Sequence, residues 1–163
     1  MNVYLTTGTF DYLKKIEAKY PDEMITLVNQ SEALLFHETS GPTVFKQPRR
    51  YEAIAASGEI KKEGFAVMNN IPVTEEGRPL FEHLIKKQVP LVEKAEGLAA
   101  LRFLRPLSSN TYIIMTVWKS EAAFNKWQNS NSFFDLKDKG FGDDGQPKIF
   151  ESSSYVRKYL ISE

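Results

Sequence analysis

Hydrophobic residues recur along the first sixty positions with two periods, one typical of helices and one typical of strands. The helical period spans residues 10–20, where Pro21 marks the expected end of the helix. A second helical segment is predicted over Arg50–Ser57, ended by Gly58. Short apolar runs predict four strands: Val3–Leu5, Met24–Asn29, Leu34–Glu38 and Thr43–Lys46. The main elements of this half are expected in the order β-α-β-β.

The region from residue 64 onward has a more regular pattern. Its predicted strands are Phe65–Ile71, Leu98–Leu104, Thr111–Trp118 and Ser154–Ile161. One helix is expected to begin at Pro79 and to end or bend at Pro90, because proline suits the first helical turn and interrupts the interior. A second helix is expected after Ser120, with Phe124 and Trp127 on one face. The order β-α-β-β-α-β is that of ferredoxin-like folds.

These two element orders predict an α+β protein organised as one structural unit. Residues 64–163 form the ferredoxin-like domain, and residues 1–63 form an incomplete copy that packs against it as a partner-like half. Residues 58–64, between the halves, are few and charged, so no flexible linker is expected.

The composition argues against several classes of protein and of site. The chain has 163 residues, 21 lysines and arginines, and 21 aspartates and glutamates, so its zero net charge argues against a nucleic-acid binder. The lack of cysteine excludes disulfides, thiolate zinc sites and a cysteine nucleophile, and it fits a cytoplasmic protein. The first residues lack the pattern of a signal peptide, and no apolar run approaches the roughly 20 residues of a membrane span.

Several segments carry a family resemblance: Ala66–Asn70, Thr116–Ser120, Ala123-Phe124, Trp127 and Phe133. They resemble the IsdG-type heme-degrading monooxygenases of the antibiotic biosynthesis monooxygenase (ABM) superfamily. Over nearly its whole length the chain is similar to the longer Bacillus form of these enzymes, and its architecture is also similar to the staphylococcal TRAP signalling proteins. Short ABM proteins are dimeric α/β barrels. The resemblance therefore implies that residues 1–63 take the partner's place and that the chain is a monomer.

The resemblance also implies a chemistry. In these enzymes heme is both substrate and cofactor, and dioxygen with an electron donor opens the ring and releases iron. The matching catalytic and heme-binding residues are Asn70 and Trp127. An amide can donate a hydrogen bond on the distal side of a heme, and a rigid indole can distort the macrocycle. The expected site is a groove that both side chains face.

The iron ligand is left open by the sequence. The family's histidine lies ten residues after the tryptophan, and that position is Lys137. Deprotonating a lysine of ordinary pKa costs about 4.6 kcal/mol at pH 7. Three alternatives follow: Lys137 contacts a propionate while water or another side chain binds iron, His83 approaches the iron, or heme is not turned over.

The same residues have simpler interpretations. Phe124 and Trp127 suit an ordinary core, Asn70 suits hydrogen bonding at a strand end, and His37 and His83 suit surface or half-buried positions. Two other functions stay open beside heme degradation. One is a non-enzymatic, TRAP-like role in regulation or stress signalling. The other is an ABM oxygenase of a small aromatic metabolite that needs no metal.

Overall fold

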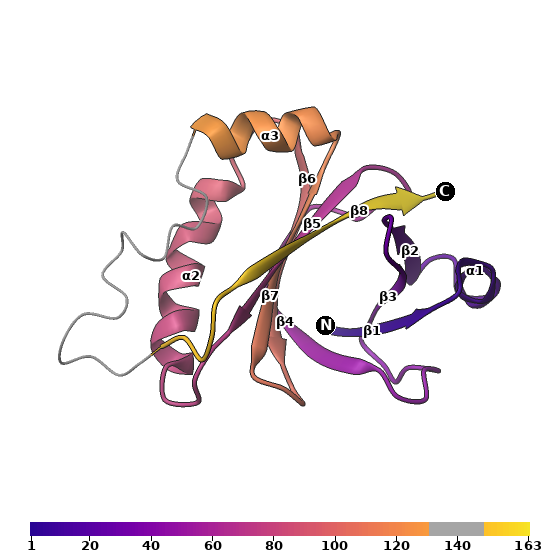
Figure 1. The fold of residues 1–163 in the computed structure, drawn as a ribbon, viewed down its shortest axis with the longest axis horizontal. Helices are drawn as coiled ribbons and strands as arrows, with labels where there is room; N and C mark the ends of the chain where they lie inside the picture. The colour runs from indigo at the N-terminus through magenta and orange to yellow at the C-terminus, as the bar shows by residue number, and fades with distance from the viewer. Residues whose placement is uncertain (131–148) are drawn as a thin grey trace.

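The fold is α+β, with three helices and eight strands in the part of the chain that the structure describes. This computed structural model describes residues 1–130 and 149–163 (Figure 1). The first half contains β1 (Asn2–Gly8), α1 (Phe10–Lys19), β2 (Met24–Val28), β3 (Ala33–Thr39) and β4 (Arg49–Ser57). The second half contains β5 (Phe65–Pro72), α2 (Arg78–Val92), β6 (Leu98–Pro106), β7 (Thr111–Trp118), α3 (Glu121–Ser130) and β8 (Tyr155–Ser162).

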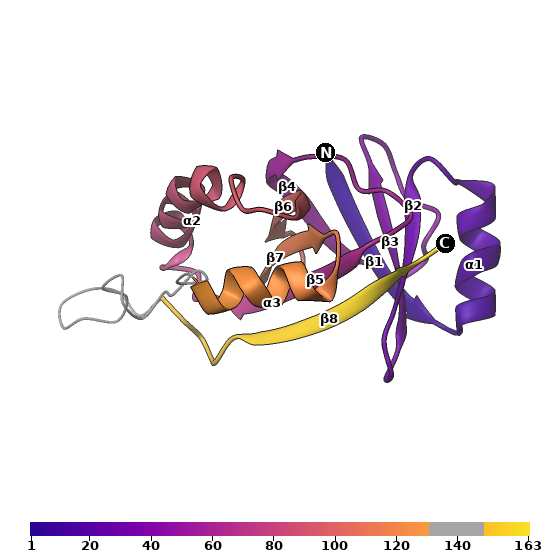
Figure 2. The same cartoon turned by 90° about the horizontal axis from the view of Figure 1, so that it is seen from above.

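The eight described strands form one closed antiparallel barrel in the order β1-β3-β2-β8-β5-β7-β6-β4. Two ladders join the halves: β2 pairs with β8, where Leu27 lies opposite Ile161, and β4 pairs with β6, where Tyr51 lies opposite Pro106. The helix α1 lies on one side of the barrel, and α2 and α3 lie on the other (Figure 1, Figure 2). The barrel therefore has an apolar interior and two helix-covered outer regions.

Strand β5 shows how the sequence builds these two faces. Successive side chains of a strand point to opposite faces. Ala66 and Met68 belong to the apolar cluster inside the barrel. Phe65, Val67 and Ile71 belong to the cluster that α2 and α3 cover. Every residue of β5 is buried, so neither face of this strand is a free surface.

Two predicted elements of the first half are wrong. Residues 49–57 form the strand β4 instead of a helix, and residues 43–46 form no strand. Residues 49–57 are rich in alanine and charged residues, which favour a helix locally. Its ladders with β1 and β6 override that preference, and a register shift lies between Ala53 and Ala55. This half is thus β-α-β-β-β.

Of the two outcomes predicted for Pro90, an end or a bend of the helix, the end does not occur, because α2 continues to Val92. A proline inside a helix removes one backbone hydrogen bond and costs about 3 kcal/mol. Val89 and Val92 on either side of it are buried in the helix-covered cluster, and this burial offsets the cost. Pro90 itself is exposed.

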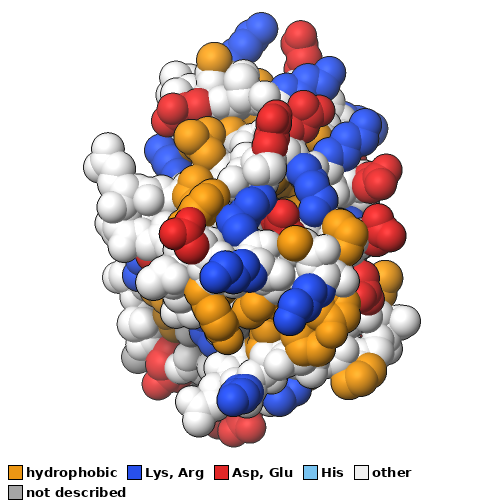
Figure 3. Space-filling view, turned by 90° about the vertical axis from the view of Figure 1, so that its right-hand side faces the viewer, with side chains coloured by type: hydrophobic (Ala, Val, Ile, Leu, Met, Phe, Trp, Pro, Cys, Tyr) orange, Lys and Arg blue, Asp and Glu red, His pale blue; other side chains and the backbone are white. Residues whose placement is uncertain are grey.

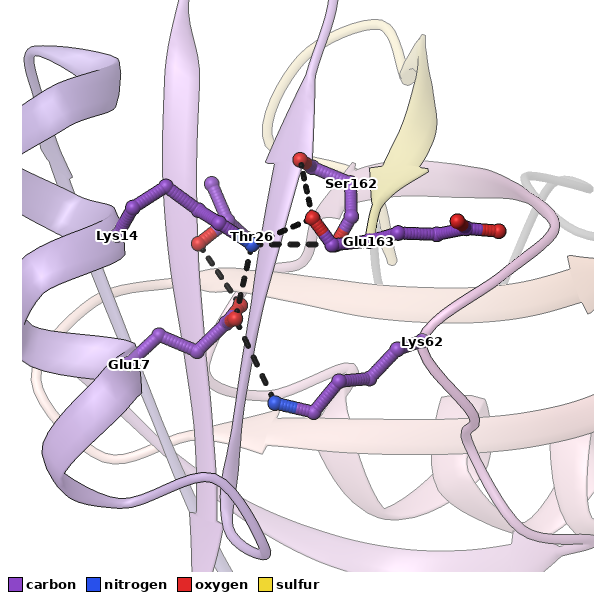
Figure 4. Close-up of polar contacts among 6 residues, drawn as sticks. All are labelled: Lys14, Glu17, Thr26, Lys62, Ser162 and Glu163. Atoms are coloured by element: carbon purple, nitrogen blue, oxygen red, sulfur yellow. Dashed lines mark hydrogen bonds and ion pairs between the residues drawn. The ribbon is translucent and has the colours of Figure 1, made fainter.

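A buried carboxylate ties the first half to the end of the chain (Figure 4). The side chain of Glu17 is 6% exposed, accepts a hydrogen bond from Thr26 Oγ1 at 2.9 Å, and lies 2.9 Å from Lys14 Nζ and 3.4 Å from Lys62 Nζ. Lys14 Nζ also donates to the carbonyl of Glu163 at 3.0 Å. Burial alone raises the pKa of Glu17, but these hydrogen bonds and charges hold it below its ordinary value.

The surface on the side of α1 carries basic and acidic side chains interspersed with one another (Figure 3). This mixture matches the equal numbers of the two charges in the sequence. That face therefore lacks the one-signed patch that a nucleic-acid binder presents.

Candidate functional site

The two asparagines of β5 face opposite sides of the barrel wall. Asn69 lies in phase with Val67 and Ile71, on the face that α2 and α3 cover. Asn70 lies in phase with Met68, on the barrel interior. Trp127 belongs to the helix-covered cluster. The structure thus brings Asn69 to the side of Trp127 and places the amide of Asn70 on the other side.

Asn69 carries an unpaired polar atom. The residue is 6% exposed, and its Oδ1 is buried without a hydrogen-bond partner among the described residues. A buried acceptor left without a donor costs about 1–3 kcal/mol. Such an atom in a folded protein requires an explanation, and a ligand that supplies the donor is one.

Trp127 stands in an aromatic cluster under α3. Its ring centroid is 5.1 Å from that of Trp118, which in turn is 5.8 Å from that of Phe124. Trp118 Nε1 donates to Thr116 Oγ1 at 2.9 Å, so this indole is fixed as a core residue. As predicted, Ser120 caps α3, since its Oγ accepts from the backbone N–H of Ala123 at 3.1 Å. The helix start thereby sets the position of both α3 aromatics.

The exposed edge of Trp127 is small. The residue is 8% exposed and lines a hollow of about 310 Å³ with Leu91 from the end of α2 and Ala95 from the segment that follows it. Lys94 and Lys126 also line this hollow. The indole is therefore mostly core, with one edge on a cleft between α2 and α3.

Strand β8 offers an open surface on the same sheet face as Asn69. Val156 lies directly opposite Asn69 and is 44% exposed, and Leu160 is 60% exposed. Between them, Lys158 holds its Nζ 5.5 Å from the ring centre of Phe124. Lys158 and Leu160 line a hollow of about 570 Å³ together with Phe65. Glu121 lines the same hollow, so its charges balance, and Lys158 is the one side chain there that can pair with an acidic group of a flat apolar molecule.

Asn70 lies in a different environment from the one expected. It is 3% exposed, and its Nδ2 donates to the carbonyl of Met68 at 3.2 Å. It lines a hollow at one end of the barrel, together with Arg49 and Arg157. The structure does not bring it to Trp127. Lys137, the third expected heme contact, lies outside the described residues.

Neither histidine lies on this face. His83 is exposed on α2, whose buried side is formed by Phe81 and Ile85. His37 lies in the first half of the chain, and its expected exposure is wrong, because it is only 2% exposed. Its Nδ1 is 2.9 Å from Thr43 Oγ1, and burial lowers the pKa of the imidazole.

The residues present fit a heme in part. The helix-covered face provides an amide with an unpaired oxygen, an aromatic wall and a cation near an open apolar strip. These groups do not line one hollow, since Trp127 lines that of about 310 Å³, Lys158 lines that of about 570 Å³, and Asn69 lines neither. In residues 1–130 and 149–163 no group of three or more His, Asp or Glu side chains could hold a metal ion. Heme iron needs only one axial side chain, and neither histidine lies on this face, so the fit concerns the macrocycle and its acidic groups.

No helix in the described part of the chain is both long and apolar enough to cross a membrane.

Comparisons with known proteins identify the family of this chain. Residues 64–139 match the family model described as antibiotic biosynthesis monooxygenase. A heme-degrading monooxygenase of Listeria monocytogenes is 30% identical over 129 residues, which cover 78% of this chain and 77% of the relative. The signal transduction protein TRAP of Staphylococcus aureus is 29% identical over 164 residues, which cover 97% and 95%. A solved structure described as a major regulator of staphylococcal pathogenesis has a TM-score of 0.81 at 26% identity, covering 98% of both chains.

Proposed function

Because the chain belongs to the antibiotic biosynthesis monooxygenase family, we propose that it binds heme against the exposed outer surface of β8, on the side of the sheet that carries Asn69 and Trp127, and degrades it with dioxygen and a reductant, releasing iron. The observation that carries this proposal is the buried amide of Asn69, which lies on the same sheet face as Trp127. Its Oδ1 has no partner among the described residues, and its N–H groups can donate to the acceptor atoms of a heme. Heme, when bound, supplies the redox chemistry of iron with dioxygen.

Asn69 takes the role that the sequence assigned to its neighbour Asn70. Its amide has a donor and an acceptor that can orient polar groups beside a macrocycle. Trp127 supplies a rigid wall held by Trp118, and a wall of this kind can distort a flat ring pressed against it. Lys158 can pair with a propionate at the open edge. The cytoplasmic location and an electron-donor partner are part of the same proposal.

We take neither His37 nor His83 as the iron ligand in this proposal. His83 is on the solvent side of α2, so the proposal does not use it. Lys137 stays a candidate, either as a contact to a propionate or as a neutral amine near the iron. Its role stays a prediction, whereas we assign Asn70 no contact with heme, because it lies on the inner side of the barrel wall.

A spectroscopic titration tests this function. Hemin added to the purified protein is expected to give a saturable shift of the Soret band at one heme per chain. Ascorbate is then expected to remove the band in air and to release chelatable iron, with catalase present to remove free peroxide. A hemin spectrum that does not change with protein overturns the proposal. Trp127→Phe keeps an aromatic core side chain and is expected to slow the loss of the band.

The similarity to TRAP over 97% of the chain favours a second candidate, a non-enzymatic role in regulation or stress signalling. The absence of a histidine at position 137 supports it too. If histidine phosphorylation has a part in that role, His83 is the accessible site, because His37 is buried. Mass spectrometry of phosphohistidine under alkaline conditions, beside the hemin titration, distinguishes the two functions.

The closed barrel within one chain supports a further part of the proposal. We propose that residues 1–63 take the place that a second subunit has in short ABM dimers. The protein is then a monomer whose heme site is formed by residues 64–163.

A further inference from the structure

One end of the barrel contains a polar hollow of about 260 Å³ that the proposed heme site does not use. Strands β1, β4, β5 and β8 and the turn between β2 and β3 all reach it. This barrel-end hollow is lined chiefly by Thr7, Glu32, Arg49, Asn70, Arg157 and Tyr159. It lies on the inner side of the barrel wall, whereas Asn69 and Trp127 lie on the outer side.

The hollow carries an excess of positive charge. No carboxylate of the described residues lies within 4.0 Å of the Arg49 guanidinium. Arg157 has one acidic neighbour, Glu32, at 3.8 Å, a distance beyond that of a charge-assisted hydrogen bond. Two guanidinium groups and one carboxylate leave a net charge of about +1. A guanidinium is a planar fork that matches a carboxylate in two-point hydrogen bonding.

Neutral donors complete the lining. Tyr159 is 2% exposed and donates its hydroxyl to Glu32 Oε1 at 2.7 Å. Burial, and then the bond to Glu32, raise the pKa of Tyr159, so the phenol stays neutral at physiological pH. Asn70 uses one N–H for the carbonyl of Met68, and the described residues leave its second N–H available. None of these groups adds negative charge to the hollow.

One wall of the hollow is aromatic. The Tyr155 ring lies in the lining, with the guanidinium carbon of Arg157 5.3 Å from its centre. An inorganic phosphate would fill only part of a space of this size. A small organic acid would place its anionic group between the arginines and its carbon skeleton against the ring.

We propose that the barrel-end hollow binds a small organic carboxylate. Arg49 and Arg157 hold the carboxylate oxygens, the free N–H of Asn70 donates a further hydrogen bond, and Tyr155 contacts the apolar part of the acid. This site is independent of the heme proposal, because it lies across the barrel wall and uses none of the same side chains.

Isothermal titration calorimetry of the full-length protein tests the site with benzoate, succinate and inorganic phosphate as probes. Saturable binding of benzoate or succinate is expected at one site per chain. Arg49→Gln is expected to weaken it about ten-fold or more, since it removes a charged donor. Arg50→Gln is the matched control, because Arg50 points outward over the Tyr4 ring and is not part of the lining. Arg49→Lys keeps the charge without the fork and is expected to give intermediate affinity.

Three results would overturn the proposal: no saturable binding of either acid, equal weakening by the substitutions at positions 49 and 50, or tighter binding of phosphate than of both acids. If the Arg49→Gln protein does not fold, as judged by circular dichroism, the Arg49→Lys protein decides the question. Unchanged affinity in that variant contradicts the forked contact.

Discussion

Replacing Asn69 by leucine is expected to stabilise the protein and to impair its reaction with heme. The side chain is 6% exposed, and its Oδ1 is buried without a partner among the described residues. An unmade hydrogen bond of this kind costs about 1–3 kcal/mol, and leucine has nearly the shape of asparagine without its polar atoms. The free energy of unfolding should therefore rise by about 1–2 kcal/mol. For a chain of this size, each kcal/mol raises Tm by about 2–4 °C.

The assay combines two measurements on the same ligand-free preparations. Urea unfolding followed by circular dichroism gives the change in stability, and hemin titration followed by ascorbate gives affinity and turnover. A rise in stability with a loss of turnover is the combination expected of a side chain kept for ligand chemistry rather than for packing.

Asn70→Leu is the matched control. Asn70 is the same residue type, adjacent in the chain and equally buried, but its Nδ2 bonds the carbonyl of Met68. Its replacement should lower the free energy of unfolding by about 1 kcal/mol and leave hemin turnover near the wild-type rate. The reasoning is refuted if Asn69→Leu is less stable than wild type, or if Asn70→Leu alone abolishes turnover.

Other expectations follow from the buried groups and from the closed barrel. Glu17→Gln should lower stability by about 2 kcal/mol at pH 7. The pKa of Glu17 is lower in the folded protein than in the unfolded chain. The extra free energy of unfolding of wild type over Glu17→Gln is therefore fully present above the unfolded-state pKa of about 4.3, and it is lost as pH falls through the folded-state pKa. The pKa of His37 is lowered in the folded protein, so as pH drops the unfolded chain takes up a proton first. The free energy of unfolding should therefore fall below about pH 6.5. His37→Gln should make Tm depend less on pH in this range. Light scattering should give a molar mass near 18.6 kDa, and a tight dimer would contradict the pseudo-partner role of residues 1–63.

The sequence predicted the strands of the second half well because their identity depends on local pattern. The β-branched run of β7 and the apolar run of β5 are buried strands whatever their partners are. The segment Arg49–Ser57 is different, since it contains three alanines and charged residues. It becomes a strand through ladders with β1 and with β6, whose partner residues lie about fifty positions away on either side. Pairing over such distances leaves no local signal.

The sequence predicted the elements of the candidate site, but not which amide of β5 faces α3. It indicated an asparagine near the end of β5 and Trp127 on the helix after Ser120, and both elements are where they were expected. Strand alternation does place Asn69 in phase with Val67 and Ile71, and Asn70 with Met68. Which of these faces receives α3 depends on the closure of the barrel by the first half of the chain. That closure is a tertiary property, so the choice between the two amides required the structure.

The central claim is that this chain degrades heme on the face that Asn69 and Trp127 share. Its most direct test is the amount of iron released from one equivalent of bound hemin by ascorbate in air, with catalase present. The expected result is close to one iron per heme for the wild-type protein, with a large loss in Asn69→Leu. Bound hemin that keeps its Soret band and its iron under these conditions would contradict the claim.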